Sequence, residues 1–320
     1  FVLPLIMSAQ SFNDVAGTQN INTGLVTFDR YGAGVSFFDI NQDGWDDLTF
    51  AMENDSLLVF INDSGNYTKT DVSIYCNGRV KHVLWVDYDN DDDFDLFMTT
   101  YSGPFELYQN DGNLNFTNVT IQSGLPNVFA NTYGASFSDF NRDGFLDFYV
   151  CKYEFGNNSS QNRTNELFKN NGDGTFTNIT QSAGVADSIK TTFQSIWIDY
   201  NHDNWPDLFV MNDRLPFDNR LYINNHDETF TDVADSVGIN MSQQFPMTST
   251  FGDFDNDEDL DVYLTNTGNG YYSKFFVNEC VNHPPEFTFS ATSVSLPASI
   301  PSYRSIIARS ITTYPAISFV

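Results

Sequence analysis

Five short acidic loops carry most of the chemistry that this sequence can do. Each loop has the pattern Asp-x-Asp/Asn-x-Asp-x-x-x-Asp, which places a side-chain oxygen at positions 1, 3, 5 and 9. The segments are DINQDGWDDL (39–48), DYDNDDDFDL (87–96), DFNRDGFLDF (139–148), DYNHDNWPDL (199–208) and DFDNDEDLDV (253–262). Their first aspartates lie 48, 52, 60 and 54 residues apart, so the loops belong to an internal repeat.

These loops offer the ligands that calcium prefers, because Ca²⁺ takes about six to eight hard oxygen atoms in flexible geometry. Positions 1, 3, 5 and 9 carry no sulfur or imidazole, and the variable position 7 is expected to contribute its backbone carbonyl. The candidate ligands, five per loop, are Asp39, Asn41, Asp43, Trp45, Asp47, Asp87, Asp89, Asp91, Asp93, Asp95, Asp139, Asn141, Asp143, Phe145, Asp147, Asp199, Asn201, Asp203, Trp205, Asp207, Asp253, Asp255, Asp257, Asp259 and Asp261. The sequence predicts about five Ca²⁺ ions. The alternative is that Asp and Asn only form hairpin turns.

Position 6 of each loop is expected to make a sharp turn around the ion. Gly44, Asp92, Gly144 and Asn204 are residue types that enter the left-handed backbone region readily, whereas Glu258 in the fifth loop fits this requirement poorly. An EF-hand has a similar first half but needs a ligating Glu at position 12 and flanking helices, and neither is present.

The charge balance supports bound cations and excludes some partners. The chain has 42 acidic and 14 basic residues and a formal net charge of -28, so nucleic acid and anionic membrane surfaces are not expected partners. Disorder is not expected either, since 41% of residues are hydrophobic and 16% aromatic. No apolar stretch approaches the roughly 18 residues of a membrane span.

The flanks of each loop repeat as well. An alternating run such as GVSFF or SIWI precedes the loop, and runs such as LFVMN, NRLYINN and TFTDVA follow it. Each unit therefore offers about four short strands separated by Asn, Asp and Gly turns. Units of this size predict an all-β chain, a β-propeller of about five four-stranded blades.

The chain divides into three segments. Residues 1–10 read as the remnant of a signal peptide, although a first strand is the alternative, and they predict a secreted or cell-surface protein. Residues 11–282 hold the propeller repeats. SFNDVA (11–16) is a lone outer-strand element, either completing the final blade or beginning the chain in mid-unit. Residues 283–320, rich in Ser, Thr and Pro, are a linker, an extra strand pair or foreign sequence.

The loop core, followed by L-[YF]-x-N-[ND]-G and F-x-[ND]-[VI]-T, resembles the FG-GAP/VCBS repeat family, which is related to the calcium-bearing blades of integrin α-subunits. The likeness covers roughly residues 11–280. It implies a β-propeller, calcium at the loop positions named above, and extracellular adhesion or ligand binding. Three loops lack Gly at position 6, and five loops occur where related propellers often have seven blades, so a fragment of a seven-bladed ring is the alternative.

Calcium is expected to be structural, because each site belongs to one repeat. A protein or carbohydrate ligand outside the cell would then contact the least repetitive loops, YSGPFE (101–106), YEFGNNSSQNRTN (153–165), NDRLPFDN (212–219) and TGNGYYS (267–273).

No catalytic residue is predicted, and GxSxG and HExxH motifs are absent. The alternative function is an extracellular carbohydrate-active lyase or hydrolase, which a convergent Lys, Arg, Tyr and His cluster would favour. Only Arg79, Lys81 and His82 lie close together in sequence, and His202 is expected to be solvated. The cysteines at 76, 151 and 280 are expected to be buried thiols or to form one incidental bridge.

Overall fold

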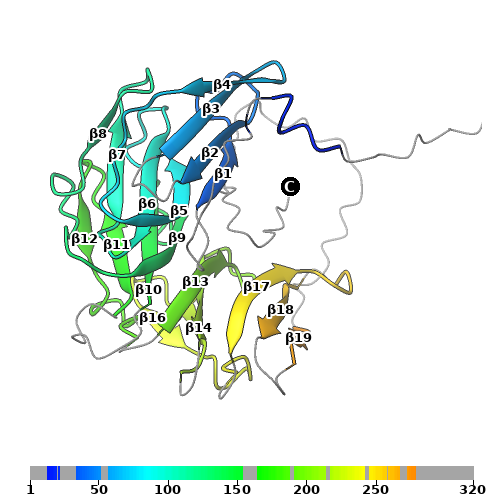
Figure 1. Ribbon diagram of the computed structural model, residues 1–320. Helices are drawn as coiled ribbons and strands as arrows, with labels where there is room; N and C mark the ends of the chain where they lie inside the picture. The colour runs from blue at the N-terminus through cyan, green and yellow to red at the C-terminus, as the bar shows by residue number, and fades with distance from the viewer. Residues whose placement is uncertain are drawn as a thin grey trace, which may run out of the picture.

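The alternating runs on either side of each acidic loop form the strands of five antiparallel sheets (Figure 1). The computed structural model describes residues 13–19, 21, 34–51, 57–153, 164–187, 191–213, 217–241, 245–257, 259–266 and 272–278. Within these ranges no helix is long and apolar enough to cross a membrane.

Strands follow one another within each sheet in chain order. The first sheet has β1 (Val35–Phe38), β2 (Asp47–Ala51), β3 (Leu57–Asp63) and β4 (Asn66–Thr70). The second has β5 (Arg79–Val86), β6 (Asp95–Tyr101), β7 (Glu106–Asn110) and β8 (Phe116–Asn118). The third has β9 (Thr132–Ser138), β10 (Asp147–Lys152), β11 (Glu166–Asn170) and β12 (Phe176–Asn178). The fourth has β13 (Thr191–Ile198), β14 (Asp207–Asp213), β15 (Arg220–Asn224) and β16 (Phe230–Asp232), and the fifth has β17 (Pro246–Gly252), β18 (Asp261–Asn266) and β19 (Lys274–Phe276).

Each acidic loop joins the first and second strands of its sheet at the same register. The residue before position 1 always pairs with the Asp at position 9, so positions 1 to 8 form a loop outside the paired strands. The pairs are Phe38↔Asp47, Val86↔Asp95, Ser138↔Asp147, Ile198↔Asp207 and Gly252↔Asp261. The sequence repeat is therefore a repeat of backbone geometry.

The sheets are arranged radially around an arc (Figure 1). Their first strands lie innermost: β5 packs against β1 and β9, and β13 packs against β9 and β17. The fourth strands β4, β8 and β12 lie at the outer rim. This arrangement confirms the predicted all-β β-propeller architecture, with one sheet per acidic loop.

The hydrophobic core lies between neighbouring sheets. At the junction of the third and fourth sheets, Phe140, Tyr149 and Leu167 of the third pack against residues of the fourth such as Leu208 and Tyr222, and all five are buried. Three similar clusters join the other neighbouring pairs. Each sheet therefore depends on the next one to bury its apolar face.

The fifth sheet exposes the face that the third buries. Phe254, Tyr263 and Phe275 stand at the sequence positions of Phe140, Tyr149 and Leu167, yet they are 66%, 44% and 45% exposed. This sheet has three strands in the described part of the chain, so four of the five sheets match the prediction of four strands.

The first sheet is also open on its other side. Phe37 is 38% exposed, whereas Trp85, at the same repeat position in the second sheet, is 1% exposed because it packs into the core shared with the first sheet. The described arc therefore ends in an uncovered blade face at each side.

Residues near the N-terminus form the turn that follows a fourth strand. The Gln19 N–H donates to the Val15 carbonyl (3.0 Å) and the Ile21 N–H to the Ala16 carbonyl (3.1 Å). The turns after β8, β12 and β16 contain the same second type of bond, in which an N–H donates to the carbonyl five residues earlier. Residues 13–19, which include the last four residues of SFNDVA, thus have the local structure expected of a blade's outer end.

The position of this turn matches as well. The Tyr67 N–H in β4 donates to Gln19 Oε1 (3.4 Å), at the place where the Phe176 N–H in β12 donates to the Ser123 carbonyl of the preceding blade (2.9 Å). The turn therefore lies beside the first sheet as a preceding blade would. Whether it completes the final blade stays a prediction.

Several expectations fall outside the described residues. These are the signal-peptide remnant at 1–10, the tail at 283–320, Glu258 and Cys280. Among the described cysteines, Cys76 and Cys151 are buried thiols, which confirms the simpler expectation for both.

Candidate metal-binding loops

The carboxylate at position 1 accepts hydrogen bonds from backbone N–H groups later in each acidic loop. Asp39 Oδ1 accepts the Asp43 N–H (3.0 Å), and Asp39 Oδ2 accepts the Gly44 N–H (2.8 Å). Asp87, Asp139 and Asp199 accept the same two donors of their own loops, and Asp253 accepts the first. The side chain thus replaces a backbone acceptor, as Asp does in tight turns.

The carboxylate at position 5 fixes the next part of the loop. Asp43 Oδ1 accepts the Trp45 N–H at position 7 (2.9 Å), and Asp203 Oδ1 accepts the Trp205 N–H (2.8 Å). The other three loops repeat this bond at 3.0 to 3.1 Å. The backbone at position 7, a predicted ligand, is therefore held by a second predicted ligand.

The left-handed turn predicted at position 6 is present in the four loops where the residue is described. Gly44 has φ 91°, Asp92 70°, Gly144 91° and Asn204 68°. Position 4 is also left-handed in all five loops, with φ between 57° and 63°, which the sequence analysis missed. Gln42 and Arg142 give no sequence signal for this conformation, although Asn and His, which stand there in the other three loops, are enriched in it.

Position 9 holds the loop to the sheet with both oxygen atoms. Asp147 Oδ2 accepts the Phe140 N–H (3.2 Å), and its Oδ1 accepts the Asn170 N–H from the third strand (2.8 Å). The other four loops repeat both bonds. These aspartates have a structural role beyond the predicted metal role, and each oxygen keeps a further lone pair.

Burial makes these carboxylates reluctant to ionise. It raises the pKa of Asp95 and of Asp147 from 3.8 to about 8, and the pKa of Asp47 and of Asp207 to about 6. Nearby aspartates of the same loop add to the rise, while backbone donors oppose it. A cation at the loop would favour the ionised form of each group.

The five loops are of two kinds, distinguished by position 3. In the first, third and fourth loops this residue is Asn; the Asn41 amide donates to Asp43 Oδ2 (3.1 Å), and the other two loops repeat the bond. In the second and fifth loops the residue is Asp89 or Asp255, so carboxylates face carboxylates. The pKa of Asp89 is raised by burial and then by Asp91.

Three carboxylates converge in each loop of the second kind. Oxygen atoms of Asp87, Asp89 and Asp91 lie within 4.8 Å of one another, and so do oxygen atoms of the second group. That second group is Asp253, Asp255 and Asp261. The structure thus brings three of the predicted carboxylate ligands together in the second loop and three in the fifth.

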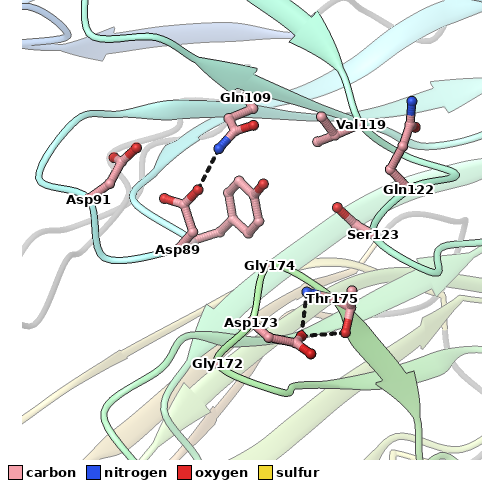
Figure 2. Close-up of a pocket in the computed structure, with 11 residues that line it drawn as sticks. Asp89, Asp91, Gln109, Val119, Gln122, Ser123, Gly172, Asp173, Gly174 and Thr175 are labelled. Atoms are coloured by element: carbon pink, nitrogen blue, oxygen red, sulfur yellow. Dashed lines mark hydrogen bonds between the residues drawn. The ribbon is translucent and has the colours of Figure 1, made fainter.

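The second loop also contains unsatisfied oxygen atoms. Asp89 Oδ1 and Asp93 Oδ1 are buried without a hydrogen-bond partner, although Gln109 Nε2 donates to the other oxygen of Asp89 (2.7 Å, Figure 2). Buried polar atoms nearly always have a partner. An oxygen-coordinated divalent cation would supply one, so the donor set fits calcium.

A hollow of about 400 Å³ lies beside this loop (Figure 2). Asp89 and Asp91 line one side of the hollow. Ser123, in the turn after β8, also lines it, and residues 172–175, the hairpin of the neighbouring third sheet, line the other side. In that hairpin Asp173 accepts hydrogen bonds from Thr175 (Figure 2). The second loop is therefore reached through a polar space between two blades.

The side chain at position 7 packs on the hairpin between the third and fourth strands. A Cβ atom at Gly172 would lie 2.8 Å from the Phe145 ring, so this hairpin has no room for a side chain there. In the fourth sheet His226 stands at the same place; its ring stacks on Trp205 (4.7 Å) and its Nε2 lies 2.8 Å from Asp203 Oδ2. The sequence analysis missed this pairing, which only the aligned hairpins could have suggested.

His202 is exposed, as the sequence analysis expected, but it also makes a contact that the sequence did not suggest. Its Nε2 lies 2.8 Å from Asp259 Oδ1 in the next acidic loop, so it joins two loops. The sequence analysis missed this contact because it considered each loop alone, whereas the radial arrangement brings consecutive loops together.

At the strand ends remote from the acidic loops, a basic side chain meets two tyrosines. Lys81 Nζ lies 5.7 Å from the Tyr101 ring centroid and 5.9 Å from that of Tyr133. Burial lowers the pKa of His82 to about 4, and its Nδ1 accepts the Ala135 N–H (3.4 Å). Lys81 and the tyrosines thus converge, while His82 is held neutral at physiological pH.

The candidate ligand-binding loops are only partly described. Residues 101–106 are described throughout, but 154–163, 214–216 and 267–271 lie outside the described residues. The prediction that these loops bind a ligand therefore stays a prediction.

Radial four-stranded sheets, each carrying one acidic loop between its first two strands, define an acidic-loop β-propeller. The chain belongs to the FG-GAP-like repeat family, which matches residues 39–98, 87–150, 155–210 and 199–264. This confirms the family resemblance that the loop pattern carries.

Curated relatives share this likeness. The chain is 26% identical over 275 residues to cartilage acidic protein 1 of Xenopus tropicalis, covering 74% of this chain and 40% of that protein. It is 25% identical over 271 residues to the Homo sapiens protein of the same name, covering 74% and 39%. The chain thus spans about two-fifths of the length of these relatives.

Solved structures with some likeness have low identity. The Vibrio cholerae biofilm matrix protein Bap1 has a TM-score of 0.39 and 14% identity, covering 73% of this chain and 34% of that one. Saccharomyces cerevisiae Sqt1 has a TM-score of 0.46 and 9% identity, covering 74% and 58%.

Proposed function

We propose that this chain is a secreted or cell-surface scaffold that binds calcium in its five acidic loops and an extracellular protein or carbohydrate through its non-repeating loops. The observation that carries the proposal is the second loop, where three carboxylates converge and two buried oxygen atoms lack a partner. Calcium there is structural, because the same loop recurs in every sheet.

The chain's own residues define each site. Side-chain oxygens at positions 1, 3, 5 and 9 and the backbone carbonyl at position 7 would hold the ion, and in the second and fifth loops Asp93 and Asp259 add a carboxylate at position 7. When bound, calcium supplies positive charge that keeps the carboxylates ionised. The side chain at position 1 already organises the loop, as a preformed site requires.

An extracellular location is supported by the acidity of the chain and by its relatives. Calcium sites of extracellular modules bind at roughly 10⁻⁴ to 10⁻³ M, which suits exposed loops with three to five side-chain carboxylates. The relatives are named cartilage acidic protein 1, and adhesion or ligand binding by this chain is proposed by analogy with that family.

Equilibrium dialysis of the EDTA-treated full chain against calcium tests the proposal. We expect about five bound ions per chain, and one fewer after Asp91→Ala. Asp71→Ala is the control, because Asp71 is an exposed carboxylate after β4, outside the acidic loops. Absence of bound calcium, or equal loss in both variants, would contradict the proposal.

A second candidate is the carbohydrate-active enzyme, favoured by the convergence of Lys81 with Tyr101 and Tyr133. Incubation with neutral and acidic polysaccharides tests it. A hydrolase produces new reducing ends, a lyase produces unsaturated ends, and either activity should be lost in Lys81→Met. No product from any polysaccharide would remove this candidate.

A further inference from the structure

Consecutive acidic loops contact each other, and position 4 makes the contact each time. The Gln42 amide of the first loop donates to the Asp92 carbonyl of the second. The Asn90 amide of the second loop donates to the Gly144 carbonyl of the third (3.0 Å). Both acceptors are the backbone carbonyl at position 6.

The next two junctions use other chemistry at the same place. The Arg142 guanidinium of the third loop lies over the Trp205 ring of the fourth, 5.4 Å from its centroid. His202 Nε2 of the fourth loop lies 2.8 Å from Asp259 Oδ1 of the fifth. Trp205 and Asp259 both stand at position 7. At each of the four junctions, the side chain at position 4 of one loop therefore contacts position 6 or position 7 of the next loop.

The left-handed backbone at position 4 accompanies every one of these contacts. Gln42, Arg142 and His202 adopt φ near 60° although a left-handed conformation costs such residues roughly 1–2 kcal/mol. The bonds that position 1 accepts from positions 5 and 6 hold the backbone in this shape. The hydrogen bonds that fix the backbone of a loop thus also hold position 4 in the conformation from which its side chain contacts the next loop.

The receiving peptide group connects the contact to a predicted ligand. In the second loop the peptide between Asp92 and Asp93 accepts from Gln42 through its carbonyl and donates through its N–H to Asp91 Oδ1 (3.1 Å). Gln42 therefore orients the peptide that precedes the ligand carbonyl at position 7. Position 4 lacks a ligand role of its own, so it is a positioning residue for the next loop's site.

We propose that the position 4 side chains couple adjacent loops, so that calcium bound in one loop favours calcium binding in the next. This inference rests on the proposed calcium binding. An ion that orders one loop holds its position 4 side chain in place, and that side chain then orders the receiving peptide of the neighbouring site. The coupling is reciprocal, because linkage requires each site to affect the other equally.

The fifth loop offers a matched control. Asn256 has the same residue type, loop position and left-handed φ (63°) as Asn90. Among the described residues, no hydrogen bond from the Asn256 side chain to another acidic loop is found, whereas Asn90 reaches Gly144. Substitution of either Asn by Gly keeps the left-handed φ available and removes only the side chain.

Calorimetric calcium titration of the EDTA-treated full chain tests the coupling. We expect Asn90→Gly to weaken the apparent affinity of the coupled ions by about fivefold or more, the lower range of measured couplings, and to lower the Hill coefficient. Asn256→Gly should bind calcium as the wild-type chain does. If Asn90→Gly fails to fold, Arg142→Gly tests the next junction, since it removes the contact with Trp205 and keeps the left-handed φ available.

The outcomes separate this inference from the proposed function. Calcium binding that is the same in wild type, Asn90→Gly and Asn256→Gly would overturn the coupling and leave the proposed function standing. Equal weakening in both variants would also overturn it, because the effect would then belong to the loop and not to the contact. A wild-type chain that binds no calcium would overturn both.

Discussion

The aspartate at position 9 shows how one residue serves fold and site together. Asp147 accepts one N–H from its own loop and one from the third strand, so its carboxylate ties three segments of a blade. Its position in the sequence predicted a metal ligand but not this role. Periodic spacing reveals which residue types recur, whereas hydrogen bonds to a strand more than twenty residues away depend on the folded sheet.

The raised pKa values predict how stability depends on pH when no cation is bound. Burial raises the pKa of Asp95 and of Asp147 to about 8, while the unfolded value is near 3.8. Between these values the folded chain holds more protons than the unfolded chain, so its free energy of unfolding falls as pH rises from about 4 to about 8.

Urea unfolding in EDTA at pH 5.5 and at pH 8 checks this direction, both values being chosen from the window above. The midpoint should be lower at pH 8. Excess calcium should remove or reverse the difference, because ligand carboxylates must be ionised to bind the ion. A midpoint in EDTA that rises with pH would contradict the assigned shifts.

Asn224 supports a second residue-scale prediction. Its buried amide donates to the Phe140 carbonyl of the preceding blade (2.8 Å) and to the Pro206 carbonyl of its own loop (3.1 Å). Asn224→Ala leaves these acceptors unpaired and should lower the free energy of unfolding by about 1–3 kcal/mol. The exposed Asn225→Ala is the control in chemical denaturation. An equal loss in both variants would show that the contact between blades contributes little.

At the scale of elements, much of the fold was predictable because each blade is local. The alternating runs before and after each loop became strands, and the FTxxT runs became the short outer strands. The turns between them follow Asn, Asp and Gly. The fifth blade differs from the prediction only in showing three strands among the described residues.

Contacts between elements of different blades were not predictable. The link from Asn90 to the third loop and the pairing of His202 with Asp259 depend on how two sheets sit side by side. One repeat contains no information about its neighbour's orientation. The candidate sites were therefore predicted one by one, and their connection emerges only from the structure.

At the scale of the whole molecule, the blades stabilise one another through a repeated interface. Phe140 of the third sheet is buried against the fourth, whereas Phe254 at the same position in the fifth sheet is 66% exposed. The repeat thus supplies its own matched pair of sites, one covered by a following blade and one uncovered.

This pair gives a direct prediction. Phe140→Ala should lower the free energy of unfolding by about 3–5 kcal/mol, because it removes a buried ring from a packed core. Phe254→Ala should change it by no more than about 0.5 kcal/mol, as is usual for surface substitutions. Both are measured by chemical denaturation of the full chain. A large loss at Phe254 would mean that a further element covers this face in solution.

Thermal unfolding of the full chain in EDTA, in millimolar calcium and in millimolar magnesium tests the central claim most directly. At millimolar calcium and dissociation constants of roughly 10⁻⁴ to 10⁻³ M, each site adds about 0.4–1.4 kcal/mol, and the contributions of the five loops should add up. The account predicts a large rise in the unfolding midpoint with calcium and a much smaller rise with magnesium. An unchanged midpoint in calcium would contradict it and leave the acidic loops as hairpin turns.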